Sequence, residues 1–421
     1  MIGEIRQNVK RKIVSVASSI SEDNVSVKKP LHKYILEIVT GVLASKSCNL
    51  TEIARSLKED ICITNTLKRI RNNAHDHPEL LELSNCYNMN KWKEKVREET
   101  IIALDAGDIC HHFGNNFENH CRLRDGSKGN TGNGYYLNQI SCCNPSERIT
   151  FPMYLDIYSS EEQNFKSMNT ESMKAVDNFV SAIGTKGLWV LDRGYDGGIM
   201  LDYFLNKDLD FVCRLTKKRH FVLGDKAISI PELVKKINRR YKIGKSFRFG
   251  YKKCYLNLEG KLHPVTVMVN KGEENKEPHI LLTNGHIKKS REIRRRVMGY
   301  YHRWGVEECY RFEKQGFGIE KSLTPNFNAI KSLLGASMLA WSVLLMVQED
   351  EILKEQVIAN SKREKSKKKD RPKFIYYSLL DGISRAFIMA KEIFRFRKPK
   401  PPKLAPTIDE LLNKSSLGMM L

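Results

Sequence analysis

The sequence predicts an α/β protein in which a mixed β-sheet is flanked by helices, with further helical regions at both ends of the chain. Between residues 98 and 216, three strand-like runs are followed by an amphipathic helix, a strand, a short helix and another strand. An order of three strands, helix, strand, helix and strand is typical of a mixed sheet with helices on its faces. Residues 1–95 have the apolar spacing of helices, and residues 217–285 read as antiparallel strands.

The charge of the chain favours a polyanionic partner. Its 421 residues suggest two or three domains, and its hydrophobic content of 41% is ordinary for a globular protein. The 71 Lys and Arg residues against 49 Asp and Glu residues give a net charge of +22. Such a balance favours nucleic acid first and an anionic membrane surface second. A basic protein without a nucleic-acid role is the alternative.

The cysteines and the longest apolar run indicate a cytoplasmic protein. The ten cysteines are scattered, and the first residues lack the apolar core of a secretory signal, so we expect free thiols in a reducing cytosol. The longest apolar run, Leu333 to Val347, has 15 residues. It is short for a bilayer span and fits a buried core helix, so we expect no membrane partner.

Residues 1–97 predict a helical N-terminal region that binds DNA. Two short helices are expected between residues 49 and 74, with Asn49 as the cap of the first and Glu52 as its capping-box partner. The second helix carries Lys68, Arg69 and Arg71. The pair loosely resembles a helix-turn-helix unit, whose basic second helix would enter a DNA groove. An ordinary helical bundle with a solvated basic face is the alternative.

Two of the strand-like runs in the central region end in an aspartate, Asp105 and Asp192. A carboxylate at the end of a buried strand is costly to bury unless it is paired or bound to a cation. If the two strands lie side by side, their carboxylates raise each other's pKa, and a divalent cation removes the conflict. The pattern therefore indicates a metal site at the strand ends.

A long helix is expected from about residue 291 to residue 314. Tyr300, Arg303, Glu307 and Lys314 lie on it at offsets of 0, 3, 7 and 14, which place them on one narrow helix face at about 100° per residue. Glu307 would add a third carboxylate. Three carboxylates with water and phosphate oxygens are the set that Mg²⁺ or Mn²⁺ prefers, and two such ions about 4 Å apart serve phosphodiester chemistry.

The remaining segments complete the domain organisation. A β-rich insertion at about 217–285 lies between Asp192 and Glu307, and another helix is expected at 326–355. Residues 362–403 hold 15 Lys and Arg against 4 Asp and Glu and read as a basic loop with a Pro-rich tail. We therefore divide the chain into a helical N-terminal region (1–97), a catalytic domain (98–345) and a basic helical or extended C-terminal region (346–421).

The helix-face residues carry a specific resemblance. The spacing Tyr300-x2-Arg303-x3-Glu307-x6-Lys314 matches the Y-R-E-K signature of bacterial insertion-sequence transposases, a group of the DDE superfamily with an RNase H-like core. "DRGYD" at Asp192 resembles the second-aspartate motif of this group, and "IALDAGDI" is similar to the first. A β-rich insertion before the Glu is also a feature of the group. The resemblance covers roughly residues 98–345 and implies an RNase H-like mixed sheet with flanking helices.

The resemblance implies cut-and-paste DNA transposition. A metal-activated water would cleave the phosphodiester at a terminal inverted repeat, and the freed 3′-OH would attack target DNA. Asp105, Asp192 and Glu307 would be the catalytic and metal-binding triad, with two Mg²⁺ or Mn²⁺ ions. A metal-dependent nuclease without strand transfer, an inactive DNA-binding relative and an RNA-binding protein are the alternatives.

The resemblance also implies how DNA is held. Tyr300, Arg303 and Lys314 would bind DNA phosphates, since Arg suits bidentate contact and Lys a point contact. Trp304 would either stack on a flipped base or pack in the core. The partners would be double-stranded DNA at the terminal repeats and the target, with a dimer in the DNA complex of a prokaryotic, nucleoid-associated protein.

Some acids compete for these roles. The group often has Ser or Thr two residues after the first Asp, but here Gly107 stands there, followed by Asp108. We favour Asp105 because it lies nearer the end of the apolar run, and expect Asp108 to cap the next turn or to support a ligand. Asp196 follows the second motif as another rival, and Glu308 points about 100° away from the signature face.

Two further features of the sequence give only weak support for a binding site. A group of metal-ligand types lies close in sequence but fits no familiar zinc finger: Cys110, His111, His112, His120 and Cys121. The Gly-rich stretch 125–134 lacks the GK[ST] ending of a P-loop, so it predicts a hairpin loop rather than a nucleotide site.

Overall fold

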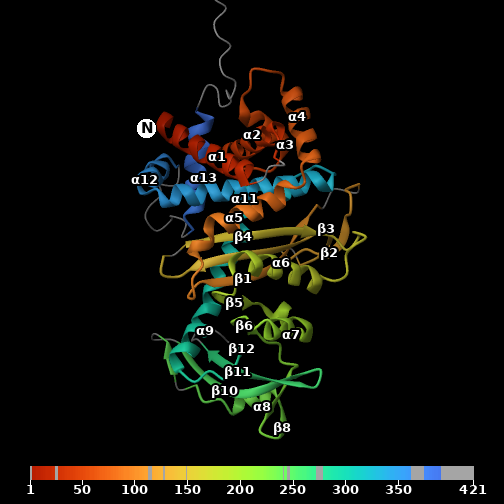
Figure 1. Ribbon diagram of the computed structural model, residues 1–421, viewed down its shortest axis with the longest axis vertical. Coiled ribbons are helices and arrows are strands. Elements are labelled where there is room, and N and C mark those ends of the chain that lie inside the picture. Colours follow the sequence, from red (N-terminus) through yellow and green to blue (C-terminus); the bar gives the residue numbers. More distant parts are fainter. Residues whose placement is uncertain are drawn as a thin grey trace, which may run out of the picture.

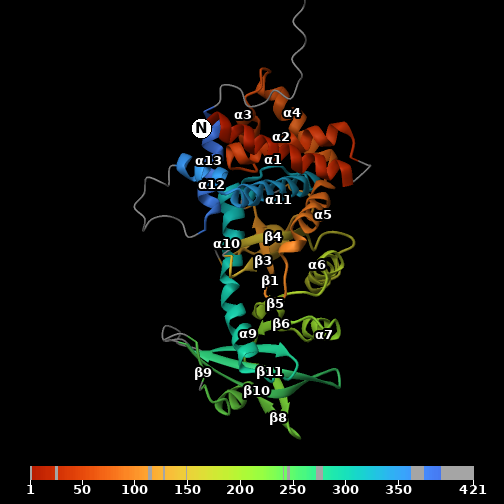
Figure 2. The ribbon, with the colours of Figure 1, turned by 60° about the vertical axis from the view of Figure 1, so that its left-hand side comes forward.

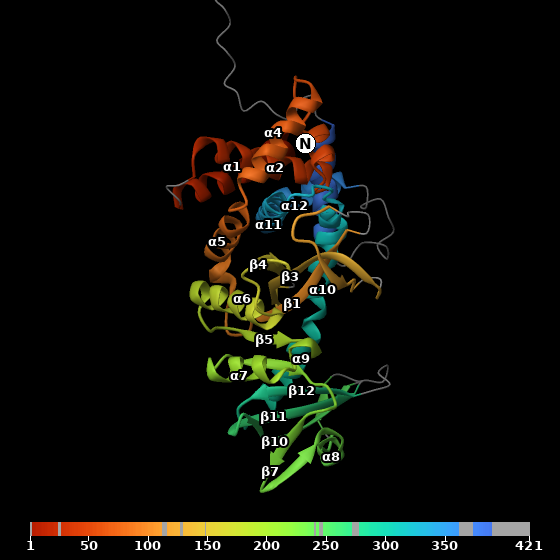
Figure 3. The ribbon, with the colours of Figure 1, turned by 90° about the vertical axis from the view of Figure 1, so that its right-hand side faces the viewer.

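The structure is a computed structural model that describes residues 2–23, 27–111, 116–126, 129–147, 149–239, 241–243, 247–271, 278–361 and 374–389. The side chains at 243, 247, 271, 304 and 306 lie outside this description. Helices from both ends of the chain gather at one end of the molecule, the sheet occupies the middle, and the β-rich insertion forms the other end (Figures 1 and 3).

The centre of the molecule is a sheet of five core strands with two connecting helices. In chain order these are β1 (Ile101–Cys110), β3 (Thr131–Asn144), β4 (Ile149–Tyr158), α6 (Met168–Ile183), β5 (Leu188–Leu191), α7 (Gly198–Asn206) and β6 (Phe211–Arg214). β1 pairs antiparallel with β3 and parallel with β5, while β4 adds antiparallel to β3 and β6 adds parallel to β5. The order β4-β3-β1-β5-β6 is that of an RNase H-like core. The predicted fold class is confirmed.

The strand sequences explain this arrangement. β5 reads LWVL and is buried throughout, as expected of a parallel strand that is covered on both faces. Its tryptophan, Trp189, packs edge-on against Phe179 of α6 and Phe204 of α7. Both connecting helices therefore cover the same part of the sheet.

The insertion extends the same sheet. Its elements are β7 (His220–Leu223), β8 (Lys226–Ser229), α8 (Ile230–Lys235), β9 (Tyr241–Ile243), β10 (Phe247–Leu258), β11 (Lys261–Lys271) and β12 (His279–Asn284). β12 pairs antiparallel with β6, so the insertion and the core share one sheet. β10 and β11 form a long hairpin whose turn residues, Glu259 and Gly260, both have positive φ, as the tight hairpin turn requires. The short strand β2 (Cys121–Arg124) pairs with the start of β3 at the opposite side.

The terminal helices pack together over the sheet. They are α1 (Ile2–Asp23), α2 (Lys29–Ser45), α3 (Leu50–Leu57), α4 (Ile63–Asp76), α5 (Leu80–Trp92), α11 (Phe327–Glu349), α12 (Glu351–Asn360) and α13 (Tyr376–Ile388). α11 lies between the N-terminal helices and β4. It is long and apolar enough to cross a membrane, but 89% of its apolar window is buried inside the protein. The apolar run at 333–347 is thus the central helix of the core.

The structure confirms one of the two hydrogen-bonding features predicted for the cap of α3. The Asn49 side chain accepts from the backbone N–H groups of Thr51 and Glu52. The N–H of Asn49 donates to Ser47 Oγ, 3.1 Å away, and not to the Glu52 side chain as the predicted capping box requires.

A nearly straight pair of helices connects the insertion to the terminal helices (Figure 2). α9 (Ser290–His302) and α10 (Trp304–Phe312) meet at Arg303, which is a turn with right-handed helical dihedrals. α10 passes into a π-helical turn, η3 (Glu313–Phe317), and then a 3₁₀ turn, η4 (Ile319–Lys321). The predicted long helix at 291–314 is therefore interrupted at Arg303 and changes its helical period at Glu313.

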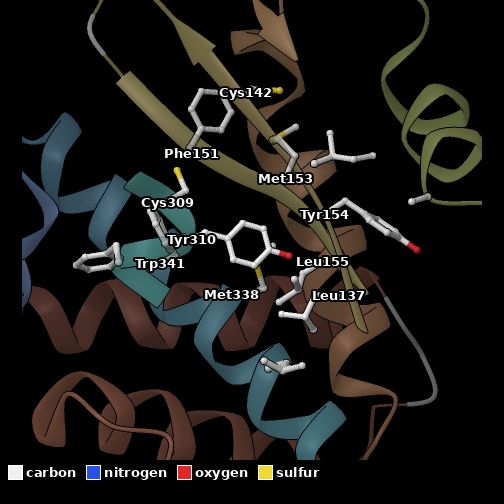
Figure 4. Packing of buried hydrophobic residues seen from close by; sticks show 14 of the residues in the cluster. Leu137, Cys142, Phe151, Met153, Tyr154, Leu155, Cys309, Tyr310, Met338 and Trp341 are labelled. Atoms are coloured by element: carbon white, nitrogen blue, oxygen red, sulfur yellow. The ribbon is translucent and has the colours of Figure 1, made fainter. Parts of the chain in front are cut away.

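The core lies where α10 and α11 meet the sheet. Leu137 and the alternating Phe151, Met153 and Leu155 reach from β3 and β4 toward Tyr310 of α10 (Figure 4). Met338 and Trp341 close the same cluster from α11. This packing fixes α10 against the sheet.

Candidate active site

Asp105 and Asp192 are neighbours at the point where the parallel pairing of β1 and β5 stops. The last backbone pair between these strands joins Leu104 to Leu191, and each aspartate is the next residue along the chain. β5 ends there, but β1 continues to Cys110, so the expectation that Asp105 ends its strand is wrong. Both side chains are half-buried. Arg214 of the next strand, β6, lies beside Asp192, because the preceding residues Cys213 and Leu191 are paired.

Glu307 of α10 brings a third carboxylate to this end of the sheet. The pKa of Asp105 is raised to about 7, first by burial and then by the negative charges of Asp192 and Glu307, against the opposing charge of Arg303. The four charged groups therefore act on one another directly. A buried carboxylate under this repulsion is the donor that a divalent cation stabilises.

Arg303 stands between the candidate acids and the aromatic side chains of α9. Its Nη2 pairs with Glu307 Oε1 at 2.6 Å, and its guanidinium lies 5.7 Å from the centre of the Tyr300 ring. Its Nε is buried and has no hydrogen-bond partner in the part of the chain that the structure describes. This donor is therefore unsatisfied within the described part of the chain.

Tyr300 and Lys314 are both held by other parts of the protein. Tyr300 is 5% exposed and packs in an apolar cluster with Leu188 and Val297. Lys314 is held in the π-helical turn, where its Nζ lies 3.4 Å from Asp108 and 2.9 Å from Glu320. Its charge is therefore already paired with protein carboxylates.

Asp108 belongs to a different group of side chains from Asp105. It lies within β1 and accepts a hydrogen bond from the distant Gly126 backbone N–H at 3.1 Å, so it does not cap the turn that follows it in the chain. Ligand-type atoms of Asp108, Cys110 and Asp125 lie within 4.8 Å of one another, which makes these residues a candidate metal group. Lys314 shares this position, so Asp108 already has a cationic partner there.

Tyr310 explains the glycine that replaces Ser or Thr after the first aspartate. A Cβ built on Gly107 would lie 2.5 Å from three atoms of the Tyr310 side chain. Tyr310 follows Glu307 by one helical turn and is buried. A side chain at position 107 would therefore require Tyr310 to move.

The other rival acids have structural partners. Asp196 accepts from the backbone N–H and hydroxyl of Thr216 at 2.7 and 2.8 Å, and pairs with Arg219 at 2.8 Å. Glu308 pairs with Arg311 on the outer side of α10. Both carboxylates are thus used to hold local structure.

Three arginines lie near the two aspartates: Arg193, Arg214 and Arg303. Only Arg303 belongs to the site that the sequence predicts. Burial lowers the pKa of His279 of β12, followed by the charges of Arg214, Arg193 and Arg303 in that order. Arg193 follows Asp192 directly, and Arg214 ends the next strand. For Arg214, the available signal was a charged residue at the end of an apolar strand.

The basic residues of α4 differ in their surroundings. Arg69 pairs with Glu59 at 2.6 Å and with Glu37 at 3.3 Å, so its guanidinium ties α4 to α2. Lys68 and Arg71 are exposed. Any DNA contact from this helix falls to these two side chains.

Among the residues that the structure describes, the Cys and His residues considered for zinc form no common ligand group. His111 and His120 lie 3.4 Å apart through Nδ1 and Nε2 and stack on Phe117. Cys121 donates to the Gly134 carbonyl oxygen at 3.2 Å. His112 lies outside the described residues, as do the Trp304 side chain and most of the basic segment 362–403. All ten cysteines are free thiols.

Comparisons with known proteins give a likeness to solved structures alone. No model of a protein family matches the sequence, and no curated protein matches it. Among solved structures, the chain is similar to a piggyBac transposase in a synaptic complex with hairpin DNA, seen by cryo-EM. The identity is 13% and the TM-score 0.45, over 97% of this chain and 82% of that chain. A likeness this weak leaves the chemistry to be judged from the side chains.

Proposed function

We propose that this protein is a metal-dependent DNA transposase of the cut-and-paste type. It would cleave DNA at terminal inverted repeats and join the freed 3′ ends to target DNA. The observation that carries the proposal is that Asp105, Asp192 and Glu307 influence one another where β1 and β5 of an RNase H-like sheet stop pairing. The Y-R-E-K spacing on α9 and α10 adds to it.

The three carboxylates fit a pair of Mg²⁺ or Mn²⁺ ions. They offer hard oxygen ligands, and burial, with smaller effects of Asp192 and Glu307, raises the pKa of Asp105 despite the opposing charge of Arg303. When bound, two such ions would activate water and stabilise the leaving oxygen of a phosphodiester. To bind metal, Glu307 would give up its ion pair with Arg303. The Arg303 guanidinium would then be free to bind DNA.

Arg303, Arg193 and Arg214 would hold the phosphates of the strand that is cut. Arg presents a fork of donors that matches a phosphate, and the Nε of Arg303 has no partner in the described part of the chain. Tyr300 would orient Arg303 through its ring. Lys314 would reach phosphate only after leaving Asp108 and Glu320.

The path of the DNA would continue along the start of α9. Lys288, Lys289, Arg291 and Arg294 are exposed there. A row of exposed cations beside a catalytic centre binds the backbone of DNA without reading its sequence. Two DNA ends cut together would require at least a dimer in the DNA complex.

Strand transfer separates a transposase from a nuclease. A precut repeat end with a free 3′-OH is incubated with plasmid and Mg²⁺. The wild type should join the two DNAs, and Asp192→Asn should not. Cleavage without joining would support a nuclease, and DNA binding with neither activity would support an inactive relative.

A further inference from the structure

A buried amide and a buried acid connect the sheet to the helix that carries Glu307. Gln139 of β3 lies directly opposite Asp105 of β1, so the two side chains share one face of the sheet. Gln139 is fully buried, and its Nε2 donates to Glu313 Oε1 at 2.8 Å. Glu313 is 1% exposed and begins the π-helical turn after α10. The bond thus links the strand neighbour of Asp105 to the helix of Glu307.

Each of the two groups has a second buried atom without a hydrogen-bond partner in the described part of the chain. These atoms are Oε1 of Gln139 and Oε2 of Glu313. If Glu313 is ionised, both are acceptors and both stay unsatisfied, which is costly in a buried site. A proton on Glu313 Oε2 would turn that oxygen into a donor for the amide oxygen of Gln139. One such proton would satisfy both atoms and close a ring of two hydrogen bonds.

The surroundings of Glu313 supply no counter-charge within the residues that the structure describes. The titratable groups that face it are Cys48, which precedes α3, and Cys309 and Tyr310 of α10. Burial raises the pKa of each, to about 12 for Cys48, so all three are neutral at pH 7. The ammonium of the adjacent Lys314 is paired elsewhere. Burial raises the pKa of Glu313 itself to about 8, and the bond from Gln139 offsets only part of this effect.

We propose that Gln139 and Glu313 form a neutral amide–carboxylic acid pair that positions Glu307 opposite Asp105. This assignment of positioning residues rests on the proposed function, because Glu307 and Asp105 are its metal ligands. Glu313 follows Glu307 by about 9 Å of helix, at roughly 1.5 Å per residue. A shift of Glu313 away from β3 would therefore carry Glu307 out of place.

The neutral state of the pair is tested by melting curves of the full chain. Glu313→Gln keeps both hydrogen bonds, since two amides also form a closed ring, but it cannot ionise. The folded-state pKa of Glu313 is raised, so its stabilising contribution is complete below its unfolded pKa and is lost as the pH rises through about 8. The melting temperature of the wild type should match that of Glu313→Gln at pH 5 and fall below it at pH 9. A constant difference between the two proteins from pH 5 to pH 9 would overturn the neutral pair.

The positioning role is tested by exchanging the two side chains. Gln139→Leu leaves Glu313 without its partner and should reduce DNA cleavage at pH 7 by roughly 10²-fold, the cost of a misplaced catalytic group. The double variant Gln139→Glu with Glu313→Gln restores an acid facing an amide and should recover wild-type cleavage and Mn²⁺ affinity. Equal cleavage by the wild type and Gln139→Leu, or no recovery in the double variant, would overturn the role.

The two proposals fail in different ways. A wild type that neither cleaves DNA nor binds Mn²⁺ would contradict the proposed function and, with it, the positioning role. The melting curves would still decide whether the pair is neutral. A wild type that cleaves, with melting curves parallel to those of Glu313→Gln, would contradict the pair alone.

Discussion

Asp192 lies beside Asp105, one residue beyond the last backbone pair of two neighbouring parallel strands. This register brings two carboxylates to the same end of the sheet, and α10 places Glu307 near enough to raise the pKa of Asp105 further. Packing of α10 on β3 and β4 maintains this arrangement. The predictions below test what these side chains do.

The first prediction concerns stability without metal. Asp105→Asn should raise the melting temperature in EDTA at pH 8, because it removes a carboxylate that burial and its neighbours destabilise. The folded-state pKa of Asp105 is raised to about 7, so its contribution to stability is complete below its unfolded pKa and is lost as the pH rises through about 7. The gain should therefore shrink toward pH 4. A variant that melts below the wild type at pH 8 would contradict this account of the site.

The second prediction concerns Arg214, which ends the strand next to Asp192. Arg214→Ala should weaken binding of duplex DNA and reduce the slope of log affinity against log salt by about 1, because one phosphate contact is lost. Lys186→Ala is the matched control, since Lys186 is exposed at the other end of β5. Equal loss of affinity in both variants would show only an effect of net charge.

The third prediction concerns the glycine under Tyr310. Gly107→Ala should lower the free energy of unfolding by about 1–3 kcal/mol, the usual cost of overpacking, since its Cβ would lie 2.5 Å from the Tyr310 ring. Urea denaturation measures the change. Gly197→Ala serves as control because no heavy atom lies within 4 Å of a Cβ there. Tyr310→Ala in the Gly107→Ala background should not lower the stability as much as Tyr310→Ala does in the wild type.

The fourth prediction concerns the C-terminal basic segment. Removal of residues 390–421 should flatten the salt dependence of DNA binding, because the segment 391–403 holds six Lys and Arg against one Glu. The cut must fall after α13, whose Leu379 and Phe387 are fully buried in the core. An unchanged salt slope in filter-binding measurements would leave the segment without a role in DNA binding.

The fold class could be predicted from the sequence, and the details of the helix face could not. The apolar run before Asp192 marks the end of β5, whereas β1 continues beyond Asp105 to Cys110, so an acid after an apolar run does not always mark a strand end. A helical wheel assumes a constant period, but the chain turns at Arg303 and becomes π-helical at Glu313. The partners of Lys314 and Arg69 are acids distant in sequence, and their pairing depends on tertiary packing. For the same reason, Gln139 and Glu313 gave no local signal.

The most direct measurement is the cleavage of DNA that carries the gene's own flanking inverted repeats, with Mg²⁺, by the wild type, Glu307→Gln and Glu308→Gln. Glu308 neighbours Glu307 but pairs with Arg311 on the outer side of the helix. The account predicts cutting at the repeat ends by the wild type and Glu308→Gln, and none by Glu307→Gln, which should still bind the DNA. Cutting that survives in Glu307→Gln would contradict the assignment of the active site.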